Sequence, residues 1–294
     1  MSDHDVLTVQ RSAPSAPAKR SRFRGMRRYP WLSQVFVLVM AVPFLVPIYI
    51  LVNLSLKNKA DSVHPLVPVT NPTFQNFIDA WEQAGLGGAL LNGLIITVAS
   101  VAILVVIASL ASYTIARSTR RWANLAFYGF LLGMIVPFQL AMFPLFSTLR
   151  ALDLIGTLQG MVIYHVGHLL PFAVFMYTSF LRRVDREYEE AAEIDGASRL
   201  RVFWSVVLPM VRPVTGTLII LNGISTWNDF LGALIYLSGQ TKTVPVALYG
   251  FVSSYYSNWN LVFAGLLVSA LPVLIIYFFM QNTIIKGFAG GLKG

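Results

Sequence analysis

Six long apolar segments constrain this chain more than any other feature of its sequence. A helix that crosses the hydrocarbon core of a bilayer needs about 20 mostly apolar residues. Six runs reach that length, at about 31–54, 89–116, 123–148, 156–181, 214–237 and 261–284. Backbone groups inside lipid must pair within their own segment, so we expect helices here rather than open strands. The sequence therefore predicts an all-α polytopic membrane protein with six transmembrane helices.

Composition agrees with a membrane protein and offers little for catalysis. Charged residues are 12% of the 294 residues, whereas soluble domains carry about 25%. The absence of cysteine excludes disulfides and thiolate chemistry. The sequence has no GxGxxG motif, and the run from Gly287 to Lys293 lacks the Gly-Lys-Ser/Thr ending of a P-loop. We therefore expect no enzyme activity, no catalytic residue and no metal site.

The first apolar run is not expected to be a cleaved signal peptide. It is too long for that role, contains Pro43 and Pro47, and lacks a small-x-small cleavage site. The residues before it are rich in Ser, Ala and Pro and then in basic residues, which is typical of a disordered tail. We expect a disordered basic tail over 1–30 and a membrane domain over 31–294.

Basic residues are distributed unevenly between alternate loops. Eighteen of the 22 Lys and Arg fall in the N-terminal tail, the loops after the second and fourth runs, and the C-terminal tail. The remaining loops hold Lys57, Lys59, Arg150 and Lys242. Because positive charge concentrates on the cytoplasmic side, both termini are expected in the cytoplasm. The net charge of +9 then reflects the topology of the chain and would also attract anionic lipid. It does not indicate that the protein binds nucleic acid.

The loop at about 182–212 is the one strongly charged interior loop. It holds six arginines and six acids, and we expect two short helices with a break between them. Asp185 is predicted to cap the first helix, with Glu187, Glu189 and Glu190 in or near its first turn. Gly196 stands where that helix is expected to end, as a C-terminal glycine commonly does.

The rest of this loop suits contact with a partner protein. Ala191 and Ala192 permit close approach of another backbone, and Glu190 offers a carboxylate to a basic side chain. Pro209 and Pro213 should stop or kink the second helix. A solvated amphipathic loop is the alternative interpretation. The second helix carries an apolar stripe spaced i, i+3, i+4, i+7 and i+8: Leu200, Phe203, Trp204, Val207 and Leu208.

Three elements of the sequence resemble one family. The spacing Glu190-Ala191-Ala192, three residues, Gly196, nine residues, Val206, one residue, Leu208-Pro209 resembles the EAA motif of ABC importer permeases. Residues 227–230, Trp-Asn-Asp-Phe, resemble an element of carbohydrate importer permeases, and 281–294 resemble their Gln…Gly…Gly…Lys-Gly ending. The resemblance covers about 31–294. Asp185 stands where many relatives have Pro, and Val206 replaces Ile.

The resemblance implies the permease subunit of an ATP-driven sugar or oligosaccharide importer, forming half of the pathway in a prokaryotic cell membrane. It also implies a second homologous permease, two copies of an ATPase that binds ATP and Mg²⁺, and an extracytoplasmic solute-binding protein. This chain itself would hold no cofactor. The C-terminal tail, 286–294, would also touch the ATPase. The residues that would couple to the ATPase are Glu190, Ala191, Ala192, Asp195, Gly196, Leu208 and Pro209.

Asp229 is the one acid inside an expected span. At the bilayer centre it would cost about 2.5–3.5 kcal/mol, so we expect it to face protein or water. One interpretation is a solute-pathway group, together with Asn222, Trp227 and Asn228. The other is a structural polar cluster that joins two helices, or a position near the outer surface. The sequence leaves these alternatives open.

His165 and His168 share one face of the fourth expected span. Because no carboxylate or cysteine accompanies them in the sequence, interhelical hydrogen bonds are favoured over solute contact, and a metal site is favoured least.

Aromatic residues mark two of the outer segments. After a predicted cap at Thr73, the i, i+3, i+4, i+7 spacing of Phe74, Phe77, Ile78 and Trp81 predicts an interfacial helix along the outer leaflet. The loop 238–260 is also aromatic. It suits an interfacial belt better than stacking on a sugar or contact with the binding protein.

Two other transport functions are weighed against a sugar importer. A glycerol phosphate importer would want basic residues in its pathway, and none falls within an expected span. An importer of polyols is a further alternative of the same class. An ion-coupled secondary transporter would usually show several embedded ionisable groups and an internal repeat, which this sequence lacks.

Overall fold

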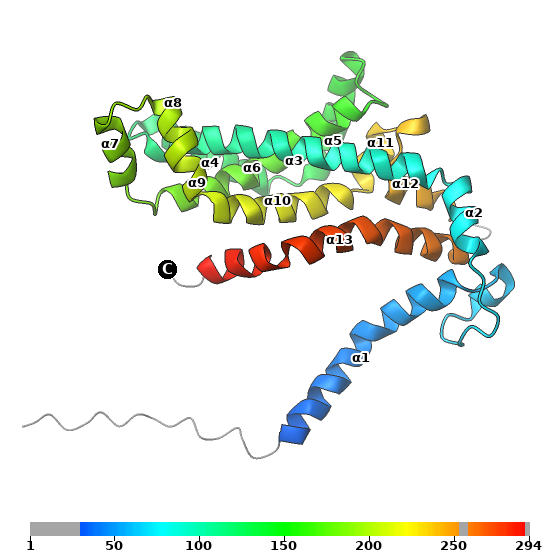
Figure 1. Ribbon diagram of the computed structural model, residues 1–294. Coiled ribbons are helices and arrows are strands. Elements are labelled where there is room, and N and C mark those ends of the chain that lie inside the picture. Colours follow the sequence, from blue (N-terminus) through cyan, green and yellow to red (C-terminus); the bar gives the residue numbers. More distant parts are fainter. Residues whose placement is uncertain (1–29, 253–257, 292–294) are drawn as a thin grey trace, which may run out of the picture. The chain divides into compact units, whose positions relative to one another are not determined.

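The computed structural model describes residues 30–252 and 258–291, and its elements are helices joined by short connections (Figure 1). The chain divides into two units, residues 1–48 and 49–294. The described part of the first unit belongs to α1 (Pro30–Ser55), which continues through Pro43 and Pro47. Most of its side chains in this unit are exposed apolar groups, as suits a helix in lipid. The tail predicted over 1–30 lies outside the described residues, apart from Pro30.

Long apolar helices form the centre of the second unit. Helix α3 (Leu86–Arg117) packs along α6 (Leu158–Leu181), and α4 (Arg121–Ile135) also packs on α6. Helix α10 (Arg212–Trp227) lies against α3 and α13 (Trp259–Gly291), as Figure 1 shows. The predicted all-α membrane class is therefore confirmed.

Two of the predicted spans are broken. The run 123–148 forms α4 and α5 (Phe138–Ala151), whose axes differ by 101°. The break falls at Pro137, where proline lacks an N–H and forces the preceding Val136 into an extended backbone. The run 214–237 forms α10 and α11 (Leu231–Tyr236), separated at 228–230.

Among the described residues, three helices are long and apolar enough to span a membrane, or up to five spans if each bent pair counts as one. These three are α1, α3 and α6, and the sixth predicted run lies within α13. The count of six spans and the orientation of the termini therefore stay predictions.

Three apolar clusters support the second unit. One joins the second half of α3 to α6 and to the segment 202–218. Another lies between α5, α6 and α11 and includes Tyr164 and Tyr236. The third joins α2 (Gln75–Gln83) to the beginning of α3, α12 (Val244–Tyr249) and α13. The charged loop is thus built on the first cluster, while Asp229 borders the second.

Asparagines fix the segments around α2. Asn53 donates to the carbonyls of residues 65 and 67 and accepts from the N–H of Val69. Asn76 donates to the carbonyls of Ser55 and Lys57, and Asn260 of α13 donates to Asn76. These bonds satisfy backbone carbonyls that lack a helical partner. They hold the chain before η1 (Lys59–Val63) to α2 and the chain after η1 to the end of α1.

Helix α2 occupies the predicted interfacial segment, with two differences. Its N-cap residue is Phe74, although the Thr73 hydroxyl still accepts a hydrogen bond from the Gln75 N–H. Phe77 packs inward against the third apolar cluster, which leaves Phe74, Ile78 and Trp81 exposed. The helix therefore keeps an apolar outer edge without the contribution of Phe77.

The second aromatic segment is only partly described. It contains η3 (Gly239–Thr241) and α12, with Tyr249 exposed beside the Phe230 ring and Phe251 packed on the third cluster. Residues 253–257 lie outside the described part of the chain. The C-terminal tail was expected to contact a partner. Its residues up to Gly291 continue α13, and 292–294 are not described.

Candidate functional site

The first helix of the charged loop begins without the predicted cap. Helix α7 (Glu187–Ile194) has Arg186 at its N-cap position, with helical backbone angles and no side-chain cap bond. The prediction for Asp185 is therefore wrong. Three glutamates do occupy the first turn, as predicted, and complement the positive end of the helix dipole.

The end of α7 follows the prediction for Gly196. This glycine has φ +84°, in the left-handed region where a side chain is strained. Its N–H donates to the Glu193 carbonyl, and the Ala197 N–H donates to the Ala192 carbonyl, both at 3.0 Å. This pair of hydrogen bonds is a Schellman motif. It turns the chain sharply from α7 toward the second helix.

The second helix combines α8 (Arg199–Val202), a π-helical turn η2 (Phe203–Val207) and α9 (Leu208–Met210). The predicted stripe is split, because Phe203 and Val207 are buried while Leu200 and Trp204 are exposed. A π turn is wider than an α-helical turn, so the side chains after it point in other directions than a regular α-helix would give them. After α9 the chain bends by 72° into α10, as the predicted kink of the second helix requires. Pro209 and Pro213 stand in the first turns of α9 and α10.

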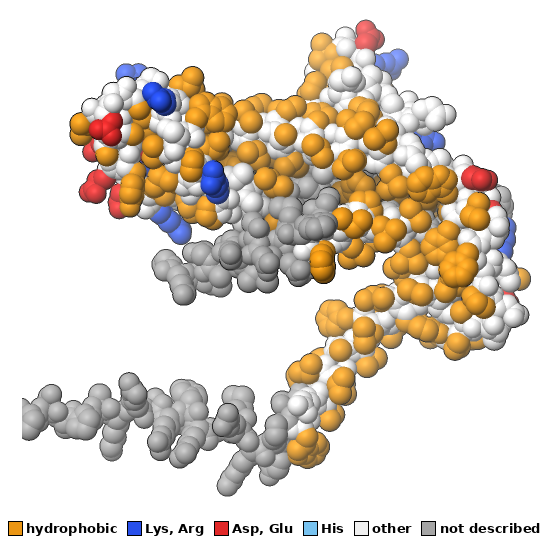
Figure 2. All heavy atoms as spheres, in the orientation of Figure 1, with side chains coloured by type: hydrophobic (Ala, Val, Ile, Leu, Met, Phe, Trp, Pro, Cys, Tyr) orange, Lys and Arg blue, Asp and Glu red, His pale blue; other side chains and the backbone are white. Residues whose placement is uncertain are grey.

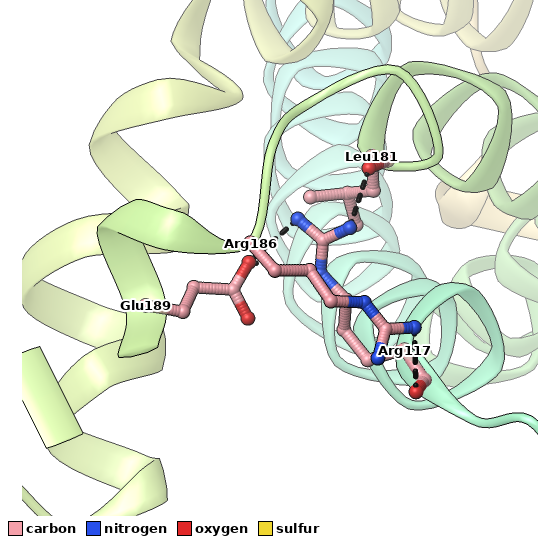
Figure 3. A network of polar contacts seen from close by, with 4 residues as sticks. All are labelled: Arg117, Leu181, Arg186 and Glu189. Atoms are coloured by element: carbon pink, nitrogen blue, oxygen red, sulfur yellow. Dashed lines mark hydrogen bonds and ion pairs between the residues drawn. The ribbon is translucent and has the colours of Figure 1, made fainter. Parts of the chain in front are cut away.

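A buried ion pair holds α7 to the membrane helices (Figure 3). The Arg117 Nε and Nη2 atoms lie 2.8 and 2.6 Å from Glu189 Oε1. Arg117 Nη1 donates to the Leu181 carbonyl at the end of α6, at 2.8 Å. Arg186 Nη2 donates to the Arg117 carbonyl at 3.0 Å. The Arg117 and Glu189 side chains are only 13% and 9% exposed.

Sequence reasoning missed this network. Glu189 was predicted only as a first-turn acid, and Arg117 only as part of the positive charge of its loop. Helix α3 in fact ends at Arg117 and not at residue 116. The sequence offered two signals of this ion pair: an arginine directly after an apolar run and an acid directly before Glu190. Their pairing needs the fold, because 72 positions of sequence separate them.

The predicted coupling residues divide between an exposed and a packed side. Glu190, Ala191, Asp195 and Gly196 are exposed. The other three are partly buried, and Ala192 and Leu208 pack against the first apolar cluster. Two large apolar side chains join the exposed side, namely Tyr188 at 61% and Ile194 at 86% exposure. Figure 2 shows acidic, basic and apolar side chains together over α7 and α8.

This exposed side is suited to binding a protein. An isolated exposed apolar residue is ordinary, but Ile194 lies at the end of a short helix beside acids, and Tyr188 stands nearly two turns earlier on α7. Exposed aromatic and aliphatic side chains among charged ones are common in protein interfaces. These outward-facing apolar side chains favour docking of a partner over the alternative of a solvated amphipathic loop.

The four predicted pathway residues point to different neighbours. Asn222 is buried and donates to the Leu218 carbonyl, and Asn228 is exposed and donates to the Ile224 carbonyl. Both amides thus bond within their own helix. The Trp227 ring lies against Gly93 of α3. Asp229 follows α10 at its break and faces α6.

Asp229 forms part of a polar and aromatic cluster at this break. Its Oδ1 atom accepts from the Gly232 N–H at 3.1 Å, and its Oδ2 atom lies 3.7 Å from His165 Nε2. A Cβ atom at Gly232 would lie 2.6 Å from the Tyr164 hydroxyl, so a larger residue there would displace the side chains of this cluster. The cluster joins α6 to the α10–α11 break, as the structural interpretation of Asp229 expects.

The two histidines take different positions in this cluster. His165 is buried beside Asp229, and its Nε2 atom has no hydrogen-bond partner. The His168 ring stacks with Tyr164 and lies 4.1 Å from the Phe138 ring. Across residues 30–252 and 258–291, no group of three or more His, Cys, Asp or Glu side chains is placed to hold a metal ion.

Comparisons with known proteins place this geometry in a family. The model of the family described as "Binding-protein-dependent transport system inner membrane component" matches residues 105–287. That range includes the charged loop, Arg117 and Asp229.

Similar curated proteins are bacterial permeases. The melibiose/raffinose/stachyose import permease protein MelC of Bacillus subtilis is 32% identical over 94% of this chain and 100% of its own length. The probable starch degradation products transport system permease protein AmyC of Thermoanaerobacterium thermosulfurigenes is 32% identical, covering 86% and 93%. The multiple sugar-binding transport system permease protein MsmG of Streptococcus mutans is 30% identical, covering 90% and 96%.

A solved structure shares the fold. A chain of a bacterial ABC transporter involved in the import of the acidic polysaccharide alginate superposes with a TM-score of 0.74 at 23% identity, over 88% of this chain and 97% of that one.

Proposed function

The chain belongs to the family of inner membrane components of binding-protein-dependent transport systems, and from that premise we propose that it is one permease subunit of an ABC importer for a sugar or oligosaccharide. The observation that carries the sugar class is the similarity to permeases named for melibiose, raffinose and stachyose, for starch degradation products and for multiple sugars. The chain is a membrane transport component rather than an enzyme, since its relatives are permeases.

The charged loop is the proposed contact with the ATPase. Tyr188, Glu190, Ala191 and Ile194 form its exposed side, which suits insertion into a groove. The Schellman turn at Gly196 fixes the direction of α7, so the helix meets its partner in one orientation. ATP and Mg²⁺ would bind to two copies of the separate ATPase. Their closure would displace the loop and switch the permease pair between outward-open and inward-open states.

The solute would pass between this subunit and a second, homologous permease. Asn222, Trp227, Asn228 and Asp229 are the candidate pathway residues of this chain. A neutral sugar fits these groups better than a phosphorylated solute, because none of the four is basic and phosphate recognition uses Arg or Lys. The glycerol phosphate alternative is therefore not favoured.

The other proposed partner is an extracytoplasmic solute-binding protein. One solved relative of the fold is an alginate importer in complex with an alginate-bound periplasmic protein, at a TM-score of 0.63 and 14% identity. In this chain the exposed edge of α2 and the loop around η3 are the segments available for such contact or for the outer leaflet. The proposed location is the cell membrane of a prokaryote.

Purification of the complex through a tag on this chain tests the proposal. We expect an ATPase and a second permease to co-purify, and ATP hydrolysis to rise when the binding protein is added with melibiose, raffinose or maltooligosaccharides. Glu190→Ala should reduce ATPase recovery or this stimulation. A chain that purifies alone and transports sugar without ATP would contradict the proposal, and it would favour ion coupling through Asp229.

A further inference from the structure

Arg117 of α3 bonds to two other helices at the base of the charged loop. It belongs to the last turn of α3, its guanidinium binds the Leu181 carbonyl that ends α6, and it pairs with Glu189 in α7 (Figure 3). Its own carbonyl accepts a bond from Arg186, next to α7. Three residues on or next to α6 and α7 therefore make polar contacts with Arg117.

Helix α7 has other contacts besides this ion pair. Through Ala192 it packs against the first apolar cluster, which includes residues of α3 and α6. Helix α7 packs on α8 and on the π turn η2, which lead through α9 into α10. Without Arg117, the path from α7 to α10 would stay intact through these elements. The path from α7 to α3 and α6 would lose the ion pair and the bonds around it.

The chemistry of this bond suits the transfer of movement. The guanidinium is a planar fork with fixed donors, so an acceptor bound on one edge is held rigidly relative to an acceptor bound on another. Both charged side chains are largely buried, where solvent screening is weak and separation of the charges is costly. A displacement of α7 would therefore carry the ends of α3 and α6 with it rather than stretch the pair.

We propose that Arg117, held by Glu189, is the positioning residue that transmits displacement of the charged loop to α3 and α6. The inference rests on the proposed function, because it takes the displacement to come from the ATPase. It goes further by assigning the residues that link the charged loop to the membrane helices. These residues precede the EAA motif and do not face the partner. Arg117 acts through α7 and has no contact with solute or nucleotide in this account.

The natural absence of cysteine permits a direct test. Leu91 is 57% exposed near the other end of α3, and 26 residues of helix place it about 39 Å from Arg117. An environment-sensitive maleimide dye on Leu91→Cys therefore reports movement of α3 rather than a local change at Arg117. The assembled complex would be measured without nucleotide and with ATP plus orthovanadate. The complex with the cysteine-free chain gives the background labelling of the other subunits.

The proposal predicts a nucleotide-dependent emission shift in the Leu91→Cys parent. Arg117→Ala and the milder Glu189→Gln should lose most of this shift while ATPase co-purification and basal hydrolysis persist. Arg117→Lys should keep part of it, because lysine retains the charge but not the fork. The matched control is Arg182→Ala, which removes a neighbouring arginine that bonds Asn124 instead of α7. It should behave as the parent does.

Failure of this inference can be distinguished from failure of the proposed function. An unchanged shift in Arg117→Ala and Glu189→Gln would overturn the inference. So would loss of the ATPase from both variants, because the pair would then only shape the docking surface. A parent that holds an active ATPase but shows no shift at Leu91 would overturn it as well, since α3 would not respond. A parent without any ATPase contradicts the proposed function itself.

Discussion

At the scale of single residues, Ile194 distinguishes a docking surface from a solvated loop. Its side chain is 86% exposed on α7, so replacing it removes little packing within the chain. Burial of such a side chain in a partner contributes about 1.5–3 kcal/mol, and about 1.4 kcal/mol corresponds to tenfold in affinity. We predict that Ile194→Asp lowers the recovery of co-purified ATPase by about tenfold or more.

Val63 supplies the matched control for this change. It is 72% exposed, and it lies in η1, outside the charged loop. Val63→Asp introduces the same side chain and should leave ATPase recovery unchanged. Equal losses from the two variants would show that a new surface charge disturbs the complex in general, which would count against docking at Ile194.

The turn at Gly196 makes a separate prediction about stability. A Cβ atom there would meet no neighbouring atom within 4 Å, so Gly196→Ala costs only backbone strain, about 1 kcal/mol for the left-handed conformation. Gly129 lies inside α4 with equally open space, and Gly129→Ala should be neutral or slightly stabilising. Thermal unfolding of the detergent-solubilised protein compares the two. A midpoint that falls no further for Gly196→Ala would contradict the assignment.

Residue-level prediction succeeded where one position determines the conformation. Gly196 was placed correctly because a left-handed turn at the end of a helix has a strong local signal. The kink predicted for the end of the second helix occurs as the 72° bend between α9 and α10. The pairing of Arg117 with Glu189 was not predictable, since it depends on the meeting of α3 and α7. The prediction that Asp185 caps α7 was wrong, since Arg186 occupies the N-cap position. The Arg186 side chain donates a hydrogen bond to the Arg117 carbonyl.

At the scale of elements, the break between α4 and α5 shows the limit of hydropathy. The run 123–148 is mostly apolar, and its hydropathy alone gives no sign of the 101° bend. The presence of proline alone does not predict a break in a helix, because α1 continues through Pro43 and Pro47 and α6 continues through Pro171. The bend is stabilised where Phe138 packs against the rings of Tyr164 and His168, with centroids at 5.2 and 4.1 Å.

Phe138 should therefore contribute more to stability than its neighbours on α5. We predict that Phe138→Ala lowers the free energy of unfolding by about 2 kcal/mol, from lost ring contacts and partial burial. Phe143, on the same helix, is 77% exposed, and Phe143→Ala should change stability little in detergent. Thermal unfolding followed by circular dichroism measures both. A larger loss for Phe143 would mean that the bend is held elsewhere.

At the scale of the whole molecule, the orientation in the membrane is predicted from charge rather than from the fold. Eighteen of the 22 basic residues lie on the side predicted to be cytoplasmic, and that side includes the charged loop. The helical class and most helix positions were predicted from apolar length. The distribution of the core into three clusters was not, because it depends on which helices pack together.

Single cysteines in the naturally cysteine-free chain test this orientation. Thr119 and Gln240 are both exposed, in loops predicted on opposite sides of the membrane. In intact cells, a membrane-impermeant maleimide should label Gln240→Cys at once and Thr119→Cys only after lysis. The reverse pattern would invert the topology and place the charged loop where no ATPase could reach it.

Docking of the charged loop on an ATPase is the central claim for the assembled transporter, and a photo-crosslinking amino acid at position 194 tests it most directly. Irradiation of cells should give a covalent adduct between this chain and the ATPase subunit, identified by mass spectrometry. The same amino acid at position 63 should give none. An ATPase adduct that is absent at 194, or equally abundant at 63, would contradict the account.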